Sequence, residues 1–242
     1  MIFLYTDFGA EGPYLAQLEV AVLAQAPGER VLNLVSNAPA ADPFRSAYLL
    51  AALSGQLPED SILVGVVDPG VGGGRLPIVV EAGGRRFVGP DNGLLSRAAA
   101  RDPAARAWRI DWRPVRLSDT FHGRDLFGPV AGRLAAGSPV ALTALSIDGL
   151  VGMDWPAVLP EVVYVDAYGN LYTGLAGGVL ADAAVLQAGG RHVAYRRTFC
   201  DAAAGEPFWY RNSCGLVEIA ISGGNARDAL GLGIGATVEA GA

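Results

Sequence analysis

Histidine and cysteine are both scarce in this chain of 242 residues, which has two of each. The cysteines, Cys200 and Cys214, do not have the spacing of metal ligands, and the histidines, His122 and His192, lie far apart in the sequence. A dedicated zinc or iron site is therefore not expected. We expect no metal, no cofactor and free thiols, as in cytoplasmic proteins.

An excess of positive charge and long apolar runs are missing as well. The net charge of -6 argues against a nucleic-acid partner, which would require a basic face. No apolar stretch reaches the ~18 residues that suggest a membrane span. No basic segment precedes the first apolar run, so a signal peptide is not evident. We expect a cytoplasmic protein that binds neither nucleic acid nor membrane.

The composition that remains is typical of a compact globular protein with many loops. Hydrophobic residues make up 51% of the chain and charged residues 17%, and there are 33 glycines. This balance excludes a disordered chain. A chain of this length can bury a substantial core and suits one large domain or two small ones.

Strand and helix patterns alternate up to about residue 150. Short apolar strands are predicted at 2–6, 31–35 and 62–67, and helices near 13–25 and 43–54. Such alternation favours a mainly parallel sheet with helices on both faces.

The pattern changes near residue 157. Long helical patterns are absent beyond it, and short strands with glycine turns are predicted instead, at 162–166, 184–188, 192–195, 216–222 and 237–240. We therefore predict two domains, an α/β N-terminal domain at 1–157 and a small antiparallel β-barrel at 158–242.

The loop from Asp68 to Arg75 is the strongest candidate for a site in the first domain. It follows the apolar run 62–67, which is typical of a buried strand, and ligands of open α/β sheets bind beyond the carboxyl ends of strands. Glycines at 70 and 72–74 allow unusual backbone conformations, and Arg75 returns close enough to pair with Asp68. A tight turn with a surface ion pair explains the same residues equally well.

His122 is the only histidine in a plausible site loop. Its side chain titrates near neutral pH, so it is a candidate for a general base or for a group that positions water. A histidine that merely begins a helix is the alternative. Arg124 and Asp125, next to it, are expected to be structural, as an ion pair.

Three turns of the second domain carry polar groups that suit a ligand. Asp166 to Thr173 contains an acid, an amide and aromatic rings, which can hold an amine and stack on a base. Asn212-Ser213-Cys214-Gly215 offers a hydroxyl and backbone N–H groups to a carboxylate. Gly223 to Ala226 offers backbone groups, although Asn225 can equally cap a short helix. Each of these stretches is also compatible with an ordinary turn.

The order of these motifs is more specific than any one of them. The chain presents them in the order Thr6-Asp7-Phe8-Gly9, Asp68 to Arg75, Pro90-Asp91-Asn92-Gly93, Thr120 to Asp125, Asp166-x-Tyr168-Gly169-Asn170, Asn212-Ser213-x-Gly215-Leu216-x-Glu218-Ile219-Ala220 and Gly224-Asn225-Ala226. Over almost its whole length it resembles the S-adenosylmethionine hydroxide adenosyltransferase family, which is related to the enzymes that make 5′-halogenated adenosines.

The resemblance implies an enzyme that hydrolyses S-adenosyl-L-methionine to adenosine and L-methionine. In this family water attacks the ribose C5′ in line, and the fold is an α/β domain followed by a β-barrel. The assembly is a homotrimer, with each active site between the N-terminal domain of one subunit and the C-terminal domain of the next.

The resemblance also assigns roles to residues of this chain. The family's catalytic trio falls on Asp68, Arg75 and His122, and its ribose-binding acid on Asp7. Contacts to the methionine part fall on Asp166 and Ser213. The adenine part falls on Asn170, on Tyr172 as a stacking neighbour, and on the turn at Asn225 and Ala226.

Two other functions compete with this interpretation. A halide-dependent adenosyl transferase would give a 5′-halo-5′-deoxyadenosine, but those relatives carry Tyr-Ser, whose serine helps to hold the halide, where this chain has His122-Gly123. A non-catalytic module that binds S-adenosylmethionine or adenosine would not need Asp68, Arg75 and His122 together. The chain departs from the usual family pattern at Gly12, Glu19 and Gly174.

Overall fold

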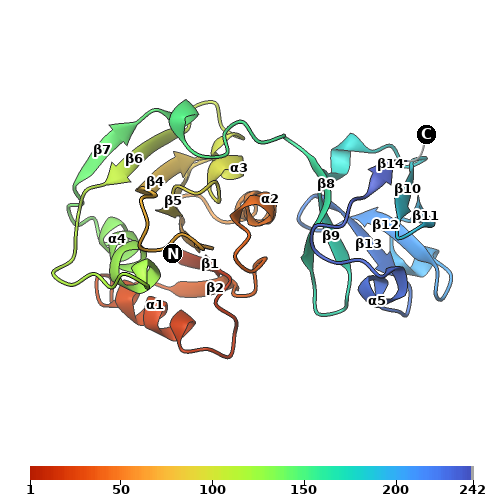
Figure 1. Cartoon of the computed structure of the whole chain (residues 1–242), viewed down its shortest axis with the longest axis horizontal. Coiled ribbons are helices and arrows are strands. Elements are labelled where there is room, and N and C mark those ends of the chain that lie inside the picture. Colours follow the sequence, from red (N-terminus) through yellow and green to blue (C-terminus); the bar gives the residue numbers. More distant parts are fainter. Residues whose placement is uncertain (241–242) are drawn as a thin grey trace. The chain divides into compact units, whose positions relative to one another are not determined.

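The computed structural model describes residues 1–240 and divides into two compact units, Met1–Trp155 and Pro156–Ala242. Each unit contains one seven-stranded sheet (Figure 1). The predicted fold class, an α/β unit followed by a barrel-like β unit, is confirmed.

The N-terminal unit carries all but one of the α-helices found in residues 1–240. Its elements in chain order are β1 (Ile2–Thr6), α1 (Tyr14–Leu23), β2 (Val31–Val35), α2 (Pro43–Ser54), β3 (Ile62–Val66), β4 (Pro77–Ala82), β5 (Arg85–Pro90), α3 (Ser96–Ala99), β6 (Arg106–Ile110), a π-helical turn (Gly123–Phe127), α4 (Gly128–Ala135), β7 (Leu142–Leu145) and a short 3₁₀ turn (Ile147–Gly149).

The sheet of this unit has the order β2-β1-β3-β5-β4-β6-β7. Its first four strands run parallel, whereas β4, β6 and β7 continue it with antiparallel pairs. The parallel pairs are thus confined to the three strands that α1 and α2 connect, β1, β2 and β3, and to their neighbour β5. Since β1 and β3 are neighbours with Thr6 opposite Val66, the segments that follow them leave the sheet at the same edge.

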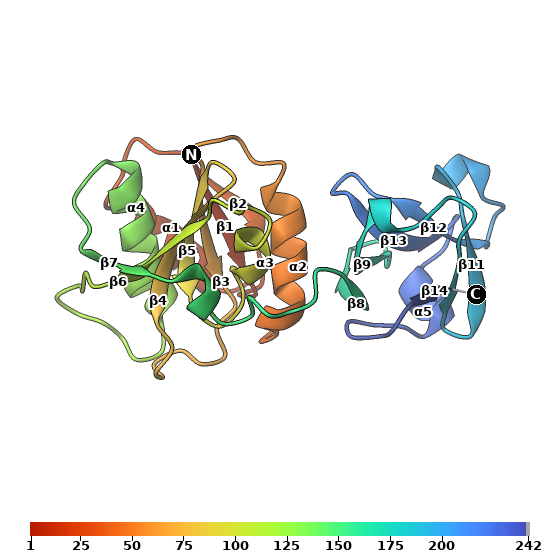
Figure 2. The ribbon, with the colours of Figure 1, turned by 90° about the horizontal axis from the view of Figure 1, so that it is seen from above.

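Helices cover both faces of the sheet, with α1 and α4 on one side and α2 and α3 on the other (Figures 1 and 2). Leu18, Val22 and Val130 are fully buried in the core between α1, α4 and the strands. The two helices pack closely because α4 contains glycine. A Cβ at Gly132 would lie only 2.6 Å from the carbonyl oxygen of Val22, so no larger residue fits there without a shift.

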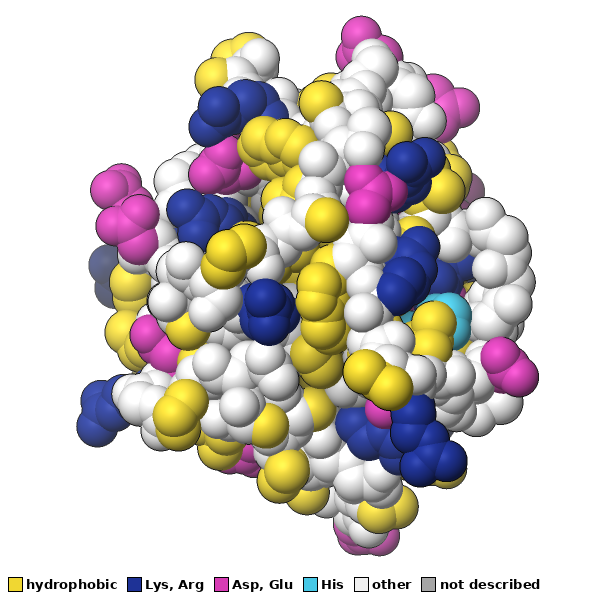
Figure 3. Space-filling view, turned by 90° about the vertical axis from the view of Figure 1, so that its left-hand side faces the viewer, with side chains coloured by type: hydrophobic (Ala, Val, Ile, Leu, Met, Phe, Trp, Pro, Cys, Tyr) yellow, Lys and Arg dark blue, Asp and Glu magenta, His cyan; other side chains and the backbone are white. Residues whose placement is uncertain are grey.

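The face of the N-terminal unit seen in Figure 3 is mixed in character. Hydrophobic side chains lie between arginines and acidic residues, and neither sign of charge forms a continuous patch on this face.

The C-terminal unit is built almost entirely from strands and short turns. Its elements are β8 (Leu159–Val165), β9 (Leu171–Ala176), a 3₁₀ turn (Gly177–Val179), β10 (Val185–Ala188), β11 (Arg191–Tyr195), a 3₁₀ turn (Phe199–Asp201), β12 (Pro207–Arg211), β13 (Leu216–Ile221), α5 (Ala226–Leu230) and β14 (Glu239–Ala240).

The strands of this unit follow the order β14-β10-β11-β12-β13-β9-β8, and every pair except β11–β12 is antiparallel. A bridge between Glu161 and Thr237, and a hydrogen bond from Val238 N to Pro160 O of 2.8 Å, bring the two ends of the sheet together. The sheet is therefore nearly closed around a core that includes Trp209 and Ile219.

Within residues 1–240, no helix is long and apolar enough to cross a membrane.

Candidate active site

A buried ion pair connects the two ends of the loop after β3. Arg75 Nε donates to Asp68 Oδ1 at 3.1 Å and to Oδ2 at 2.9 Å, and Arg75 Nη2 also contacts Oδ2. Only 3% of the Asp68 side chain and 10% of the Arg75 side chain are exposed. The predicted pairing is present, and it is not a surface ion pair, because both charges are removed from water and held in a bidentate geometry.

Glycine lets this loop approach its neighbour. Gly72 has φ +78°, and a Cβ there would collide with the carbonyl oxygen of Asp119. The loop after β3 therefore packs against the segment that leads to His122, which no other residue at position 72 would permit without a shift.

The side chains of His122 and Arg75 are in contact here, although the two residues are 47 positions apart in the sequence. Arg75 Nη2 lies 2.9 Å from His122 Nδ1. A guanidinium only donates hydrogen bonds, so Nδ1 accepts, and the proton of the neutral ring is assigned to Nε2. The Arg75 guanidinium also lies 5.4 Å from the centre of the Phe127 ring, which limits its movement.

The surroundings of His122 keep its ring neutral. Its pKa is lowered, first by burial and then by the positive charge of Arg75, while Asp68 and Asp125 act in the opposite direction. A neutral imidazole has one nitrogen able to take a proton, and here that nitrogen is Nδ1, which faces Arg75.

The segment that carries His122 is held by Asp125. The Asp125 carboxylate accepts a hydrogen bond from Ser118 N at 2.9 Å and pairs with Arg124, which also donates to Gln17 Oε1 at 3.0 Å. Arg124 and Asp125 thus have the structural role predicted for them. His122 itself lies at the start of the π-helical turn 123–127, a type of turn often found at functional sites.

A cavity of about 120 Å³ lies beside these residues, at the carboxyl ends of β1 and β3. Asp7, Asp68 and His122 line it, together with the rings of Phe8 and Phe121. Asp7 is fixed through one oxygen, since Ala41 N donates to its Oδ2 at 2.9 Å. Three predicted site residues from distant parts of the sequence therefore share one small cavity, and Arg75 adjoins it.

Aromatic rings pack along one wall of this cavity. The ring centres of Phe8 and Phe121 lie 5.6 Å apart, and Tyr14 packs edge-on against Phe121 at 5.3 Å. A Cβ on Gly123 would lie 3.3 Å from both phenylalanine rings. A side chain at position 123 would therefore require these two rings to shift.

The candidate residues of the C-terminal unit form a second cluster. Asp166 Oδ1 accepts hydrogen bonds from Tyr168 N and Asn170 N, both at 2.9 Å, and its Oδ2 accepts from Asn170 Nδ2 at 3.0 Å. Gly169, with φ +82°, lies directly against the side chain of Asn225. The turn at 166–170 therefore contacts the start of α5.

Asn225 and Ala226 begin α5. Asn225 Oδ1 accepts from Asp228 N at 3.0 Å, so the capping role considered for Asn225 is confirmed. Ala226 is fully buried. Arg227 N donates to Gly169 O at 2.9 Å, which ties the two turns together.

A pocket of about 530 Å³ opens beside the turn at 166–170. Asp166, Asn170 and Tyr172 line it as predicted site residues, and Phe199, Tyr210 and Glu218 line it as well. Burial, followed by the negative charges of Glu218 and Asp166, raises the pKa of Tyr172, so its hydroxyl stays protonated. Aromatic walls with a few polar groups are typical of a pocket for a flat, partly polar ligand.

Ser213 is not among the residues that line this pocket, but it lies in a turn that is joined to it. Asn212 Oδ1 accepts from Cys214 N and Leu216 N, both at 3.0 Å, and so fixes the turn that carries Ser213.

Sequence reasoning did not assign a role to Phe199, Tyr210 or Glu218. A signal was available for Glu218, because it is the one charged residue within the apolar strand β13 and is only 1% exposed. A buried charge requires partners, so such a residue points to a polar cluster.

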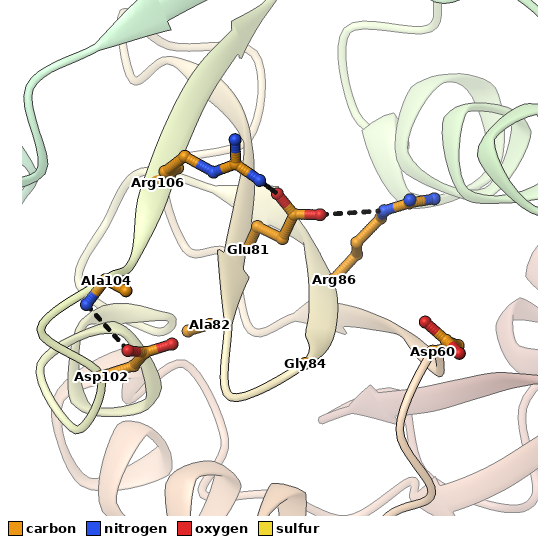
Figure 4. A pocket seen from close by; sticks show the side chains of 8 residues that line it. All are labelled: Asp60, Glu81, Ala82, Gly84, Arg86, Asp102, Ala104 and Arg106. Carbon is orange, nitrogen blue, oxygen red and sulfur yellow. Dashed lines mark hydrogen bonds and ion pairs between the residues drawn. The ribbon is translucent and has the colours of Figure 1, made fainter.

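A third hollow, of about 320 Å³, lies at the turn between β4 and β5 (Figure 4). Its charges bind one another: Glu81 pairs with Arg106 at 2.7 Å and with Arg86 at 3.5 Å, and Asp102 accepts from Ala104 N. The hollow lies beside Asp60, just before the amino end of β3, whereas ligands of open α/β sheets bind at carboxyl ends. We assign no ligand to it.

The part of the chain described by the structure contains no group of three or more His, Cys, Asp or Glu side chains able to hold a metal ion.

Comparison with known proteins gives a consistent result over nearly the whole chain. Residues 2–144 match the family model of the SAM hydroxide adenosyltransferase N-terminal domain, and residues 160–239 match that of the C-terminal domain. An (R)-S-adenosyl-L-methionine hydrolase of Thermus thermophilus is 37% identical over 257 aligned positions, which cover 98% of both chains. Another, from Salinispora arenicola, is 38% identical over 239 positions, covering 93% of this chain and 91% of that one.

A solved structure supports the same conclusion for the fold. The crystal structure of an uncharacterized conserved protein from Thermotoga maritima superposes with a TM-score of 0.85 at 28% identity and covers 99% of each chain.

Proposed function

The chain belongs to the SAM hydroxide adenosyltransferase family and hydrolyses S-adenosyl-L-methionine, and from this premise we propose how its residues carry out the reaction. Water attacks the ribose C5′ in line with the departing sulfur. The C5′–O bond forms as the C5′–S bond breaks, and the bonding electrons stay on sulfur. Sulfur leaves as the neutral thioether of L-methionine, and the water loses one proton, which gives adenosine.

The main difficulty of this reaction is the weakness of water as a nucleophile. A sulfonium is already a good leaving group, so no acid is needed to protonate it. Correct positioning can contribute ~7–11 kcal/mol of the barrier. General base help contributes about 10²–10⁴-fold in rate. The site therefore needs above all a rigid set of groups that fixes one water molecule in a small cavity.

The buried array of Asp68, Arg75 and His122 is the observation that carries the proposal. Asp68 holds the Arg75 guanidinium at two points, and Arg75 in turn holds His122. In our proposal Arg75 orients the water and keeps its own proton, because a guanidinium rarely loses it. His122 accepts the water's proton at Nδ1, the basic nitrogen of the neutral ring, once Arg75 Nη2 turns its hydrogen bond from Nδ1 to the water.

Recognition of the substrate is assigned to the remaining residues. Asp7 binds the ribose hydroxyls through the carboxylate oxygen that Ala41 does not hold. Asn170, Tyr172 and the turn at Asn225–Ala226 bind adenine, and Asp166 and Ser213 bind the methionine part. The 530 Å³ pocket with aromatic walls supports the assignment of adenine to the C-terminal unit.

The catalytic array and the aromatic pocket belong to different units of the chain. We therefore propose a homotrimer in which residues 1–157 of one subunit and 158–242 of the next form each active site. Both cysteines are free, which fits the proposed cytoplasmic location.

Water is favoured over a halide by the packing at Gly123. A serine at this position would bring its Cβ to 3.3 Å from Phe8 and Phe121, so the hydroxyl that helps to hold a halide in the halogenating relatives has no ready space here. The products of the reaction test the choice between water and halide. Incubation with S-adenosylmethionine and chloride is expected to give adenosine and methionine in equal amounts and no 5′-chloro-nucleoside.

The role of His122 predicts the pH dependence of turnover. Its pKa lies below the ordinary value of 6.5, so the ring is neutral at neutral pH and gains a proton only in more acidic solution. That proton would occupy Nδ1 and face the N–H donor of Arg75, so the ring could no longer accept a proton from water. We expect kcat/KM to stay constant above about pH 6.5 and to fall below it. A pH–rate profile measures this, and a rate that increases on acidification would contradict a neutral His122.

A further inference from the structure

A row of polar and aromatic side chains crosses four neighbouring strands of the C-terminal unit. Glu218 on β13 is paired in register with Tyr172 on β9 and with Tyr210 on β12. Tyr172 is paired in turn with Tyr164 on β8, and their rings touch edge-on with centres 5.6 Å apart. Residues directly opposite in a sheet lie on the same face, so this row faces one side of the barrel-like sheet.

Glu218 is the point at which this row is joined by hydrogen bonds. The Tyr210 hydroxyl donates to Glu218 Oε1, and Asn212 Nδ2 donates to Oε2 at 2.9 Å. Tyr172 lies opposite Glu218 in the neighbouring strand. Two donors thus converge on a side chain that is 1% exposed. An ionised carboxylate accepts only, so it suits this set of donors better than any amide.

The same carboxylate connects two parts of the proposed substrate site. Tyr172 and Tyr210 form walls of the aromatic pocket. Asn212 fixes the turn that carries Ser213, through hydrogen bonds from Cys214 N and Leu216 N. Asn212 Oδ1 accepts both hydrogen bonds of that turn, so Nδ2 points toward Glu218. The flipped orientation of the amide, with Oδ1 and Nδ2 exchanged, is therefore excluded.

We infer that Glu218 is a positioning residue for substrate binding, whose buried carboxylate holds Tyr210 and the Asn212–Ser213 turn in one fixed arrangement beside Tyr172. The inference rests on the proposed function, in which these groups bind the adenine and methionine parts of the substrate. Glu218 itself touches none of the reacting atoms. Its removal is therefore expected to weaken binding and to leave the chemical step nearly unchanged.

A purely structural role for Glu218 predicts a different outcome, namely a lower melting temperature with equal losses in kcat and binding. Burial raises its pKa above the ordinary value of 4.5, against the lowering effect of Tyr210 and Asn212. Folding thus disfavours the ionised form, so the stability that this group contributes is present below pH 4.5 and is lost as the pH rises through its raised pKa. If Glu218 positions the substrate groups, the melting temperature of Glu218→Gln at neutral pH should stay close to that of the unmodified protein, because removal of the buried charge offsets the lost hydrogen bond.

The test is Glu218→Gln in the full-length protein, with Glu239→Gln as the matched control. Glu239 lies exposed in β14, and its replacement removes the same charge. An amide at 218 presents a donor where the carboxylate accepted, so at least one of the two hydrogen bonds must be lost or reversed. We expect KM for S-adenosylmethionine and the Kd for adenosine to rise about tenfold. The kcat should stay within about twofold, and the melting temperature should not fall.

A second variant, Tyr210→Phe, removes one of the two donors and should shift KM in the same direction by a smaller factor. Unchanged KM and adenosine affinity in Glu218→Gln would overturn the inference. So would a lowered melting temperature accompanied by equal losses in kcat and binding, which indicates a folding role. Absence of turnover by the unmodified protein would refute the proposed function instead, and adenosine binding measured by calorimetry would still decide the role of Glu218.

Discussion

Replacing Arg75 by lysine is expected to lower kcat about 10³-fold, a loss similar to that caused by removing a preorganised hydrogen-bond donor in other enzymes. Lysine keeps the charge but is a single point donor, so it cannot bind both oxygens of Asp68 and His122 Nδ1 at once. Affinity for adenosine should remain within about twofold, because that ligand is assigned mainly to the C-terminal unit. Single-turnover kinetics and calorimetry measure the two effects separately.

Lysine is a better first variant than alanine at this position. Arg75→Ala would leave Asp68, whose side chain is only 3% exposed, as a buried charge without its partner. Breaking such a pair costs about 3–5 kcal/mol of the free energy of unfolding, enough to confuse loss of catalysis with loss of fold.

His122→Ala removes the other partner of Arg75 and leaves the buried pair intact, so it should also abolish most turnover without that cost. Arg86→Ala is the matched control, because Arg86 lies in the hollow at the β4–β5 turn and its side chain is 46% exposed. Wild-type rates in Arg75→Lys and in His122→Ala would show that the catalytic trio is assigned wrongly.

A variant inactivated in its N-terminal unit and a variant inactivated in its C-terminal unit are expected to regain activity when they assemble in the same trimer. Arg75→Lys damages the N-terminal unit, whereas Asn170→Ala damages the aromatic pocket of the C-terminal unit. If each site takes one unit from each of two subunits, a mixed trimer contains some sites in which both units are intact. In a mixed trimer of either composition, one of the three sites combines two intact units, so about a third of the sites are expected to be intact.

The measurement is the rate per subunit of co-expressed chains purified through two different tags. The control is each variant alone at the same total concentration. Activity no higher than the average of the two variants alone would contradict a site shared between subunits and would place both parts of the site within one chain.

The residue pattern predicted those parts of the site that are local in sequence. Asp68 and Arg75 lie on one loop, and glycines along it allow Arg75 to return, so their pairing followed from the spacing. The contact between Arg75 and His122 did not follow, because it depends on how the segment before the π-helical turn packs against the loop after β3. Only the family resemblance united these three residues in advance.

The C-terminal unit shows the same limit. The turn at Asp166 and the cap at Asn225 were recognisable from short motifs, since Asp and Asn make their hydrogen bonds within four residues. Glu218 lies beside side chains of β9 and β12, and that register depends on the order of strands in the sheet. Sequence spacing carries no information on such partners, although a charge in an apolar strand does show that partners must exist.

The sheet of the N-terminal unit was predicted as mainly parallel because strands and helices alternate along the first part of the chain. The alternation holds from β1 to β3, and β5 joins β3 as a further parallel strand. β6 and β7 extend the sheet by antiparallel pairs and carry arginine and threonine among their apolar residues, so their patterns did not indicate buried strands.

The most direct test of the whole account traces the oxygen atom of the attacking water into the product. The protein is incubated with S-adenosylmethionine and chloride in water enriched in ¹⁸O, and the products are separated and their masses are measured by mass spectrometry. The account predicts equal amounts of adenosine and methionine, with one ¹⁸O atom in adenosine at C5′ and none in methionine. A 5′-chloro-nucleoside, or adenosine without the label, would contradict attack of water on C5′ at the cavity formed by Asp68, Arg75 and His122.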